Sequence, residues 1–298
     1  MVQTTKPDWG KRIQRAIHLA ERSPATAEVL AFYRRILDFQ KMLYDEISAR
    51  PSIALDIANP FRKQLEVDMA AKHLPGLLSL VQSSGPSKLA QEAARVSSVS
   101  SDQRRQMLDD FLSATEGDDT GASLFFARVL FQPLAENLAA EQAVQLAGFS
   151  GSVCPVCGAR PQVAVLRPEG DGGKRFLICS FCVTEWEFRR ILCPICGEED
   201  YQKLPRYSAD DLAAVRVEAC DTCKYYLKSV DMTVDGLAVP LVDEIATAPL
   251  DLWAAEQGYT KIRSNIMGFQ GKCRPWRGWR QFSYPTQHSA CRLRAGLN

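Results

Sequence analysis

Four Cys-x-x-Cys pairs lie within seventy residues of this chain, and they constrain its fold more than any other feature. Two residues between paired cysteines let the backbone turn beneath a metal ion, so that both sulfurs occupy one edge of a tetrahedron. Eight thiols are enough for two four-sulfur metal sites. The candidate ligands are Cys154, Cys157, Cys179, Cys182, Cys193, Cys196, Cys220 and Cys223.

The spacing of the pairs favours sequential pairing into two tandem modules. There are 21 residues between Cys157 and Cys179, and 23 between Cys196 and Cys220. Each module is predicted to be a metal knuckle, a β-hairpin and a second knuckle, the arrangement shared by zinc ribbons and rubredoxins. Crossed pairing, in which the first and third pairs share a metal, stays open because only ten residues separate the second pair from the third.

Glycines and strand-like runs support this interpretation of the cysteine region. Gly158 and Gly197 follow the first and third pairs, where a knuckle needs a positive φ that glycine adopts without steric cost. Apolar runs at 162–166 and 175–178 are joined by the glycine-rich segment 169–173, which predicts a hairpin. That segment lacks the Gly-Lys-Ser/Thr ending of a phosphate loop, so we interpret it as a turn.

The first half of the chain has helical periodicity. Ser23 can cap a long amphipathic helix with Pro24 in its first position, and Arg50-Pro51 closes it. Further helices are expected at 61–81, after Ser100, and at 120–146, with 82–87 as a loop. Ser100 and Gln103 have the spacing of a capping box.

The whole chain is therefore predicted to be α+β, an N-terminal helical bundle followed by two tandem rubredoxin-like or zinc-ribbon modules. The expected domains are 1–150 (helical), 151–190 and 191–236 (the two modules) and 237–298 (a C-terminal segment with a basic tail). In that tail, Cys273, His288 and Cys291 supply three ligands at no familiar spacing, so no third metal site is expected.

Composition and charge limit the compartment and the partners. The 298 residues are 46% hydrophobic, and 36 Lys and Arg nearly balance 35 Asp and Glu. No global positive field draws the chain to nucleic acid or to a membrane surface, so neither partner is expected. Eight cysteines at metal spacing, with no recognisable secretory signal, favour a reducing compartment and hence the cytoplasm.

Three segments carry a resemblance to a known family. They are 177–186 (LICSFCVTEW), 217–229 (VEACDTCKYYLKS) and 250–259 (LDLWAAEQGY). Together with the four cysteine pairs, they resemble the formate dehydrogenase accessory proteins called FdhE. The resemblance extends from 32–40 in the first long helix to about residue 269, and the basic tail beyond it matches nothing in the family.

The resemblance implies a function that spacing alone does not give. It implies a cytoplasmic factor for the assembly of respiratory formate dehydrogenase, which contacts the catalytic subunit of that enzyme and is not itself an enzyme. Family members are similar to rubredoxins in their metal modules and are associated with iron. Two iron ions per chain are therefore expected, with zinc as the alternative because four-sulfur tetrahedra suit both metals.

Two other functions stay open on the residues alone. A zinc-ribbon protein that binds nucleic acid is permitted by the modules but not encouraged by the balanced charge. A rubredoxin-like electron carrier requires a reversible iron couple. Next to the second knuckle, Thr184, Glu185 and Trp186 are interpreted either as a contact for a partner or as a cover over the sulfurs.

Overall fold

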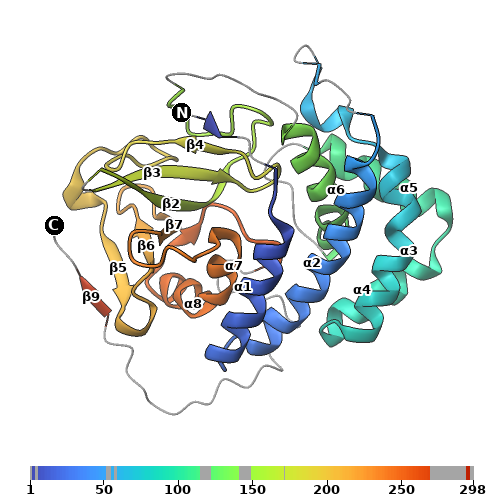
Figure 1. The fold of residues 1–298 in the computed structure, drawn as a ribbon, viewed down its shortest axis with the longest axis horizontal. Helices are drawn as coiled ribbons and strands as arrows, with labels where there is room; N and C mark the ends of the chain where they lie inside the picture. The colour runs from blue at the N-terminus through green and yellow to red at the C-terminus, as the bar shows by residue number, and fades with distance from the viewer. Residues whose placement is uncertain are drawn as a thin grey trace.

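The structure is a computed structural model that describes residues 2–3, 6–51, 55–56, 59–114, 122–140, 149–170, 172–268 and 293–295. Helices occupy one side of the molecule and a twisted sheet the other, with α1 lying between them (Figure 1). The helices are α1 (Trp9–Arg22), α2 (Ala27–Ser48), α3 (Val67–Ser84), α4 (Ser87–Ser98), α5 (Ser101–Ser113), α6 (Ala122–Ala140), α7 (Pro240–Ala246) and α8 (Ala248–Glu256).

The helical region begins earlier than the sequence predicted. Helix α1 was missed, although Asp8 caps it by accepting a hydrogen bond from the backbone N–H of Lys11 at 2.9 Å. Ser23 and Pro24 do not open the next helix as expected. They lie in the turn between α1 and α2, and Thr26 precedes the first residue of α2.

The connection between the next two helices is also shorter than expected. Residues 82–87 were predicted to be a loop, but α3 continues to Ser84 and α4 starts at Ser87. Helix α3 passes through Pro75 without ending there. The capping box at the start of α5 is confirmed, because Ser100 Oγ accepts from the Gln103 N–H at 3.2 Å and Gln103 Oε1 accepts from the Ser100 N–H at 3.1 Å.

The described strands form one nine-stranded sheet in the order β1-β4-β3-β2-β7-β6-β5-β9, with β8 also paired to β7. The hairpin of β2 and β3 confirms the predicted one, and β5 with β6 forms its counterpart between the third and fourth cysteine pairs. The strands are β1 (Val2–Gln3), β2 (Pro161–Glu169), β3 (Gly172–Cys179), β4 (Glu185–Glu187), β5 (Arg206–Ala209), β6 (Val215–Ala219), β7 (Tyr225–Asp231), β8 (Thr260–Lys261) and β9 (Leu293–Ala295).

The two hairpins are joined into one sheet by β7, which lies between β2 and β6. Strand β2 pairs with β7 in parallel, in a register that places Val163 opposite Lys228 and Val165 opposite Val230. The sequence did not indicate this pairing, because a parallel contact between strands of separate modules leaves no local signal. A single sheet therefore carries both cysteine-bearing regions.

Two helices that the sequence did not predict fasten the sheet to the helical region. Helix α7 packs against β7 and β2, α8 packs against β6 and β8, and α1 packs against α7. Arg15 of α1 binds Asp243 of α7 through Nε at 3.0 Å and Asp235 through Nη2 at 2.6 Å. The helical and sheet regions therefore share polar contacts as well as packing.

The apolar core is continuous across the two regions. One cluster runs from Leu30 and Phe126 in the helices to Leu177 and Trp186 in the sheet. A second cluster fills the space between the sheet and α8, around Val217 and Leu250. A helical region followed by a sheet that carries the cysteines confirms the predicted α+β class.

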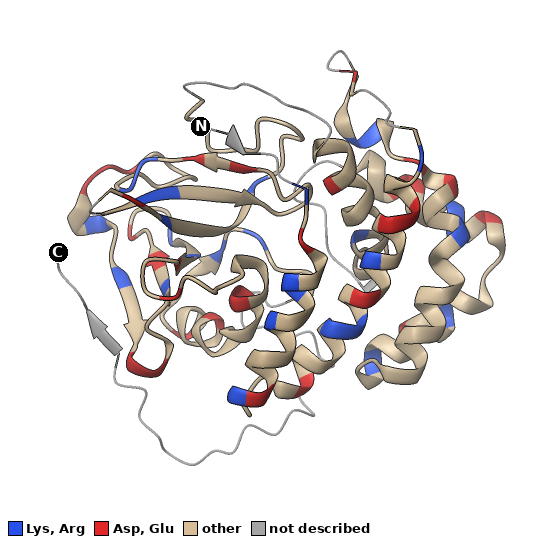
Figure 2. Ribbon diagram, in the orientation of Figure 1, with Lys and Arg blue, Asp and Glu red and all other residues tan. Residues whose placement is uncertain are grey.

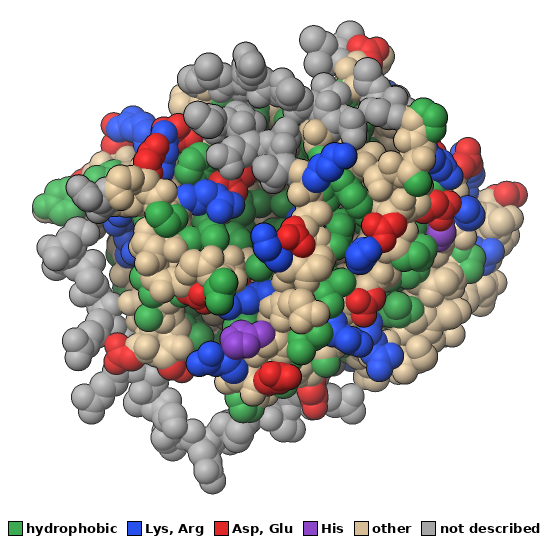
Figure 3. Space-filling model, viewed as in Figure 1, with side chains coloured by type: hydrophobic (Ala, Val, Ile, Leu, Met, Phe, Trp, Pro, Cys, Tyr) green, Lys and Arg blue, Asp and Glu red, His purple; other side chains and the backbone are tan. Residues whose placement is uncertain are grey.

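Charges of both signs are interspersed over the described surface. Lys and Arg alternate with Asp and Glu along the ribbon (Figure 2), and the face seen in Figure 3 shows no extended area of one sign. No helix in the described part of the chain has both the length and the apolar character needed to cross a membrane. The residues considered for a third metal site, Cys273, His288 and Cys291, lie outside the described residues.

Candidate metal centres

The first cysteine group gathers around the β2–β3 hairpin. Cys154 and Cys157 lie in the turn before β2, Cys179 ends β3, and Cys182 lies in the turn that follows. The Sγ atoms of Cys154 and Cys182 are 3.5 Å apart, and those of Cys157 and Cys179 are 3.3 Å apart. All four sulfurs lie within 4.8 Å of one another.

The second group repeats this arrangement around the β5–β6 hairpin. Cys193 and Cys196 lie in a turn between β4 and β5, while Cys220 and Cys223 lie in the turn between β6 and β7. The Sγ atoms of Cys193 and Cys223 are 3.7 Å apart, and those of Cys196 and Cys220 are 3.6 Å apart. The cysteines are therefore grouped as sequential pairing predicted, and the crossed arrangement is wrong.

These distances fit a tetrahedral metal ion in both groups. A zinc–sulfur bond of about 2.3 Å gives a tetrahedron with edges of about 3.8 Å. The measured contacts of 3.3 to 3.7 Å are close to that edge and far from the roughly 2.05 Å of a disulfide. Four thiolate donors at this spacing suit Zn²⁺ or iron.

The backbone around the first pair of each group has the knuckle geometry. The Gly158 N–H donates to the Cys154 carbonyl at 2.9 Å, and the Gly197 N–H donates to the Cys193 carbonyl at 3.1 Å. The φ angles of the two glycines are 76° and 74°, as the sequence predicted. A residue with a side chain is strained in this conformation, so glycine is the natural choice.

Polar hydrogens point at the sulfurs. The Phe181 N–H donates to Cys179 Sγ at 3.3 Å, and the Ile195 N–H donates to Cys193 Sγ at 3.4 Å. The Thr184 hydroxyl lies 3.1 Å from the Cys182 sulfur. Such donors stabilise thiolates in the same way that hydrogen bonds to metal-bound histidines and carboxylates stabilise those ligands.

The two groups differ in their access to solvent. In the first group Cys154, Cys179 and Cys182 are buried, and burial raises the pKa of the Cys179 and Cys182 thiols well above the ordinary value. A buried set of thiolates therefore needs a cation to form. In the second group Cys196 is exposed and Cys223 is half-buried, so this centre is open to water on one side.

The residues just after Cys182, from Thr184 to Trp186, are packed beside the first cysteine group. Trp186 is fully buried and donates from Nε1 to the Gly151 carbonyl at 3.0 Å, and Thr184 is 2% exposed. Glu185 binds Arg167 in a two-bond ion pair, at 2.5 and 2.7 Å. All three residues are buried and Thr184 contacts the Cys182 sulfur, which favours the interpretation of this segment as a cover over the sulfurs.

Family models match both cysteine-bearing regions. The model "FdhE, central domain" matches residues 153–190, and "FdhE, C-terminal domain" matches 191–267. "Protein FdhE homolog" of Aquifex aeolicus is 31% identical over 263 residues, which cover 84% of this chain and 92% of the relative. The chain belongs to the FdhE family. "Protein FdhE" of Escherichia coli K12 is 28% identical over 284 residues, or 89% of each chain.

A solved structure from the FdhE family has the same fold. The crystal structure of the FdhE protein from Pseudomonas aeruginosa covers 89% of this chain and 98% of its own, with a TM-score of 0.67 and 24% identity. Each of the two matched FdhE domains contains one four-cysteine group. The C-terminal domain runs to residue 267 and so includes α7 and α8 together with the second group.

Proposed function

We propose that this protein is a cytoplasmic, metal-binding accessory protein without catalytic activity, which acts in the assembly of formate dehydrogenase by contacting its catalytic subunit. Membership of the FdhE family supports the proposal, through the resemblance of its cysteine segments to formate dehydrogenase accessory proteins. The observation that carries it is the pair of four-sulfur groups built into one sheet against the helices.

The eight cysteines are proposed to hold one metal ion in each group. Four sulfurs close a tetrahedral site, whereas catalytic zinc keeps one position for water or substrate. The donor set therefore suits a metal that organises the fold or senses its surroundings, and does not suit hydrolysis. We propose iron as the resident metal on the family resemblance, with zinc as the competitor because both accept four thiolates.

The proposal is tested by capturing the partner enzyme from a cell extract prepared without oxygen. The tagged chain is expected to retain the formate dehydrogenase catalytic subunit, identified by mass spectrometry, and to restore formate dehydrogenase activity in cells that lack it. The double variant Cys193→Ser/Cys196→Ser is expected to lose both effects. Lys41→Gln, on the exposed side of α2, is the control that should keep them.

The same material separates the two competing functions. Recovery of nucleic acid with no dehydrogenase, in a complex that dissociates as salt rises, would favour a nucleic-acid-binding ribbon protein. An iron-loaded protein that cycles reversibly between oxidation states, yet neither binds nor rescues the enzyme, would favour an electron carrier. Both results would contradict the assembly function.

A further inference from the structure

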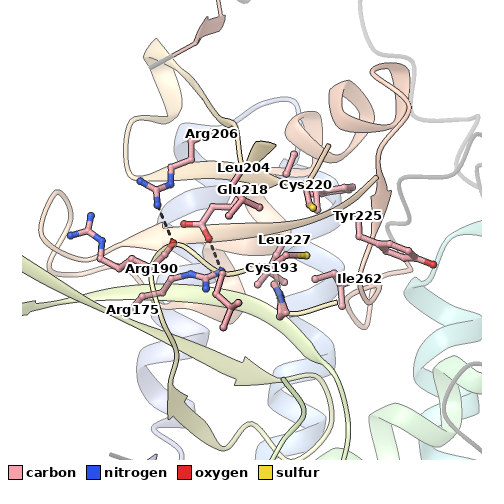
Figure 4. Close-up of a pocket in the computed structure, with 14 residues that line it drawn as sticks. Arg175, Arg190, Cys193, Leu204, Arg206, Glu218, Cys220, Tyr225, Leu227 and Ile262 are labelled. Carbon is pink, nitrogen blue, oxygen red and sulfur yellow. Dashed lines mark hydrogen bonds and ion pairs between the residues drawn. The ribbon is translucent and has the colours of Figure 1, made fainter. Parts of the chain in front are cut away.

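A small pocket beside the second cysteine group is lined by an unusual set of charges. It lies between β3, β6 and the segment that leads to Cys193, and its volume is about 30 Å³. Arg175 and Arg206 reach toward the single carboxylate of Glu218, whereas the exposed side chain of Arg190 points away from it (Figure 4). Two guanidinium groups beside one carboxylate give the pocket an excess of positive charge.

The arginines are held in place by contacts that leave this excess uncompensated. Arg175 Nη2 binds Glu218 Oε2 at 2.8 Å, and Arg175 Nη1 donates to the Arg189 carbonyl at 2.9 Å. Arg206 Nη2 donates to the Arg190 carbonyl at 3.1 Å and has no carboxylate partner among the described contacts. The carboxylate of Glu218 thus faces the guanidinium groups of both Arg175 and Arg206.

Arg175 also has a buried donor with no partner. Its side chain is 3% exposed, and its Nε–H makes no hydrogen bond to the described residues. A buried N–H without an acceptor is costly, so such a group in a pocket indicates a missing acceptor. Burial lowers the pKa of Arg206, and the neighbouring arginines lower it further. An anion in the pocket would relieve both effects.

The charge of the adjacent metal centre does not account for these arginines. Cys193 and Cys220 line the pocket, and a tetrathiolate centre is negative. However, none of the three guanidinium groups donates to a described cysteine sulfur; their described hydrogen bonds end on Glu218 and on backbone carbonyls. These contacts leave the Arg175 Nε–H, beside the pocket, without an acceptor among the described residues.

We propose that this pocket binds a small carboxylate. Planar guanidinium groups recognise planar carboxylates through paired hydrogen bonds, and Glu218 already shows that the pocket wall accepts one. A water molecule needs about 10 to 15 Å³ on this measure, so about 30 Å³ holds a group of a few heavy atoms such as acetate. The carboxylate comes either from a free small acid or from an acidic side chain of a partner, and the site does not depend on formate dehydrogenase as the client.

Titration of the full chain, with its metal content measured, tests the site. Carbon-13 acetate is added at constant ionic strength, with chloride as the balancing anion, and binding is followed by line broadening and by calorimetry. Saturable binding is expected, with affinity about tenfold weaker in Arg206→Gln because one charge-assisted hydrogen bond is lost.

Arg189→Gln is the matched control. Arg189 is an exposed neighbour that binds Glu199 at 2.7 Å and does not line the pocket, so its variant should bind acetate like the wild type. A capped peptide with one glutamate, compared with its glutamine form, identifies a protein-borne carboxylate; binding of acetate alone identifies a free acid. Absence of saturable binding, equal affinity in Arg206→Gln and Arg189→Gln, or preference for phosphate over acetate would overturn the proposal. Loss of metal from Arg206→Gln without any acetate binding by the wild type would assign the arginines to the metal centre instead.

Discussion

Val183 and Lys224 have the same left-handed backbone conformation, with φ of 59° at both residues. Each follows the last cysteine of its metal centre, in the position that Gly158 and Gly197 occupy after the first pairs. All four knuckles therefore close with the same backbone turn, although only two of them carry glycine. Valine in this conformation is uncommon and strained, so the surrounding sheet must hold it there.

The cost of a side chain at this turn can be measured at Gly197. An added Cβ would meet no atom within 4 Å, so Gly197→Ala has a conformational cost and no steric one. We expect Gly197→Ala to lower the free energy of unfolding by about 1 kcal/mol. The loss is measured from the shift in the denaturation midpoint of the metal-loaded protein. Gly197→Asn should lose less, because asparagine tolerates this conformation. Equal losses for the two variants would contradict this account.

The two centres should release metal at different rates. Cys196 is exposed and Cys223 is half-buried, whereas three of the four sulfurs in the first group are buried. We expect two metal equivalents per chain and a biphasic release to a chelator, with one equivalent in each phase. Cys220→Ser should abolish the fast phase and Cys179→Ser the slow one.

A colorimetric chelator assay, with total metal from elemental analysis, follows both phases. Release in a single phase would show that access to solvent does not set the rate. Loss of the slow phase from Cys220→Ser would assign the phases the other way round.

The sequence predicted the site better than it predicted the fold around it. The Cys-x-x-Cys spacing is a local signal, and with Gly158 and Gly197 it indicated both groups and their pairing. The parallel contact of β2 with β7 and the convergence of Arg175 and Arg206 depend on residues far apart in the chain, which leave no periodic pattern. Asp8, an N-cap followed by apolar residues at helical spacing, was a usable signal for α1.

A buried group of charges fastens α7 and α8 to the sheet. Lys228 and Asp251 are bound at 2.7 Å with side chains 0% and 2% exposed, and Lys261 and Glu244 form a second buried pair beside them. Asp251→Asn removes one charge from this balanced set and leaves an excess buried cation. We expect a loss of about 3 to 5 kcal/mol in unfolding free energy.

Chemical denaturation of Asp251→Asn beside Arg189→Gln checks this expectation. The control breaks an exposed ion pair and should cost less than about 1 kcal/mol. A similar small loss for both variants would mean that water reaches the buried group.

Glu244 should make stability depend on acid pH. Burial by itself raises the pKa of Glu244, but Lys228 and Lys261 lower it to about 2. Because this is below the ordinary carboxyl pKa of about 4.3, the ionised group contributes stability that is present above about pH 4.3 and is lost as pH falls toward 2. Glu244→Gln should lose less stability over this window than the wild type. Metal content is followed at each pH, because acid also protonates the cysteines.

Arg15 should hold α1 against the sheet that carries the cysteines. Its side chain is 10% exposed and binds Asp243, which is 5% exposed, and also Asp235. Arg15→Gln leaves Asp243 buried without its cation, so we expect a loss of about 3 kcal/mol and faster hydrogen exchange in α1 and α7. Arg34→Gln, which removes an exposed pair with Asp38 on α2, should change neither. Faster hydrogen exchange throughout the sheet, rather than in α1 and α7 alone, would contradict this expectation. It would show that Arg15 stabilises the whole fold and not only the contact between α1 and α7.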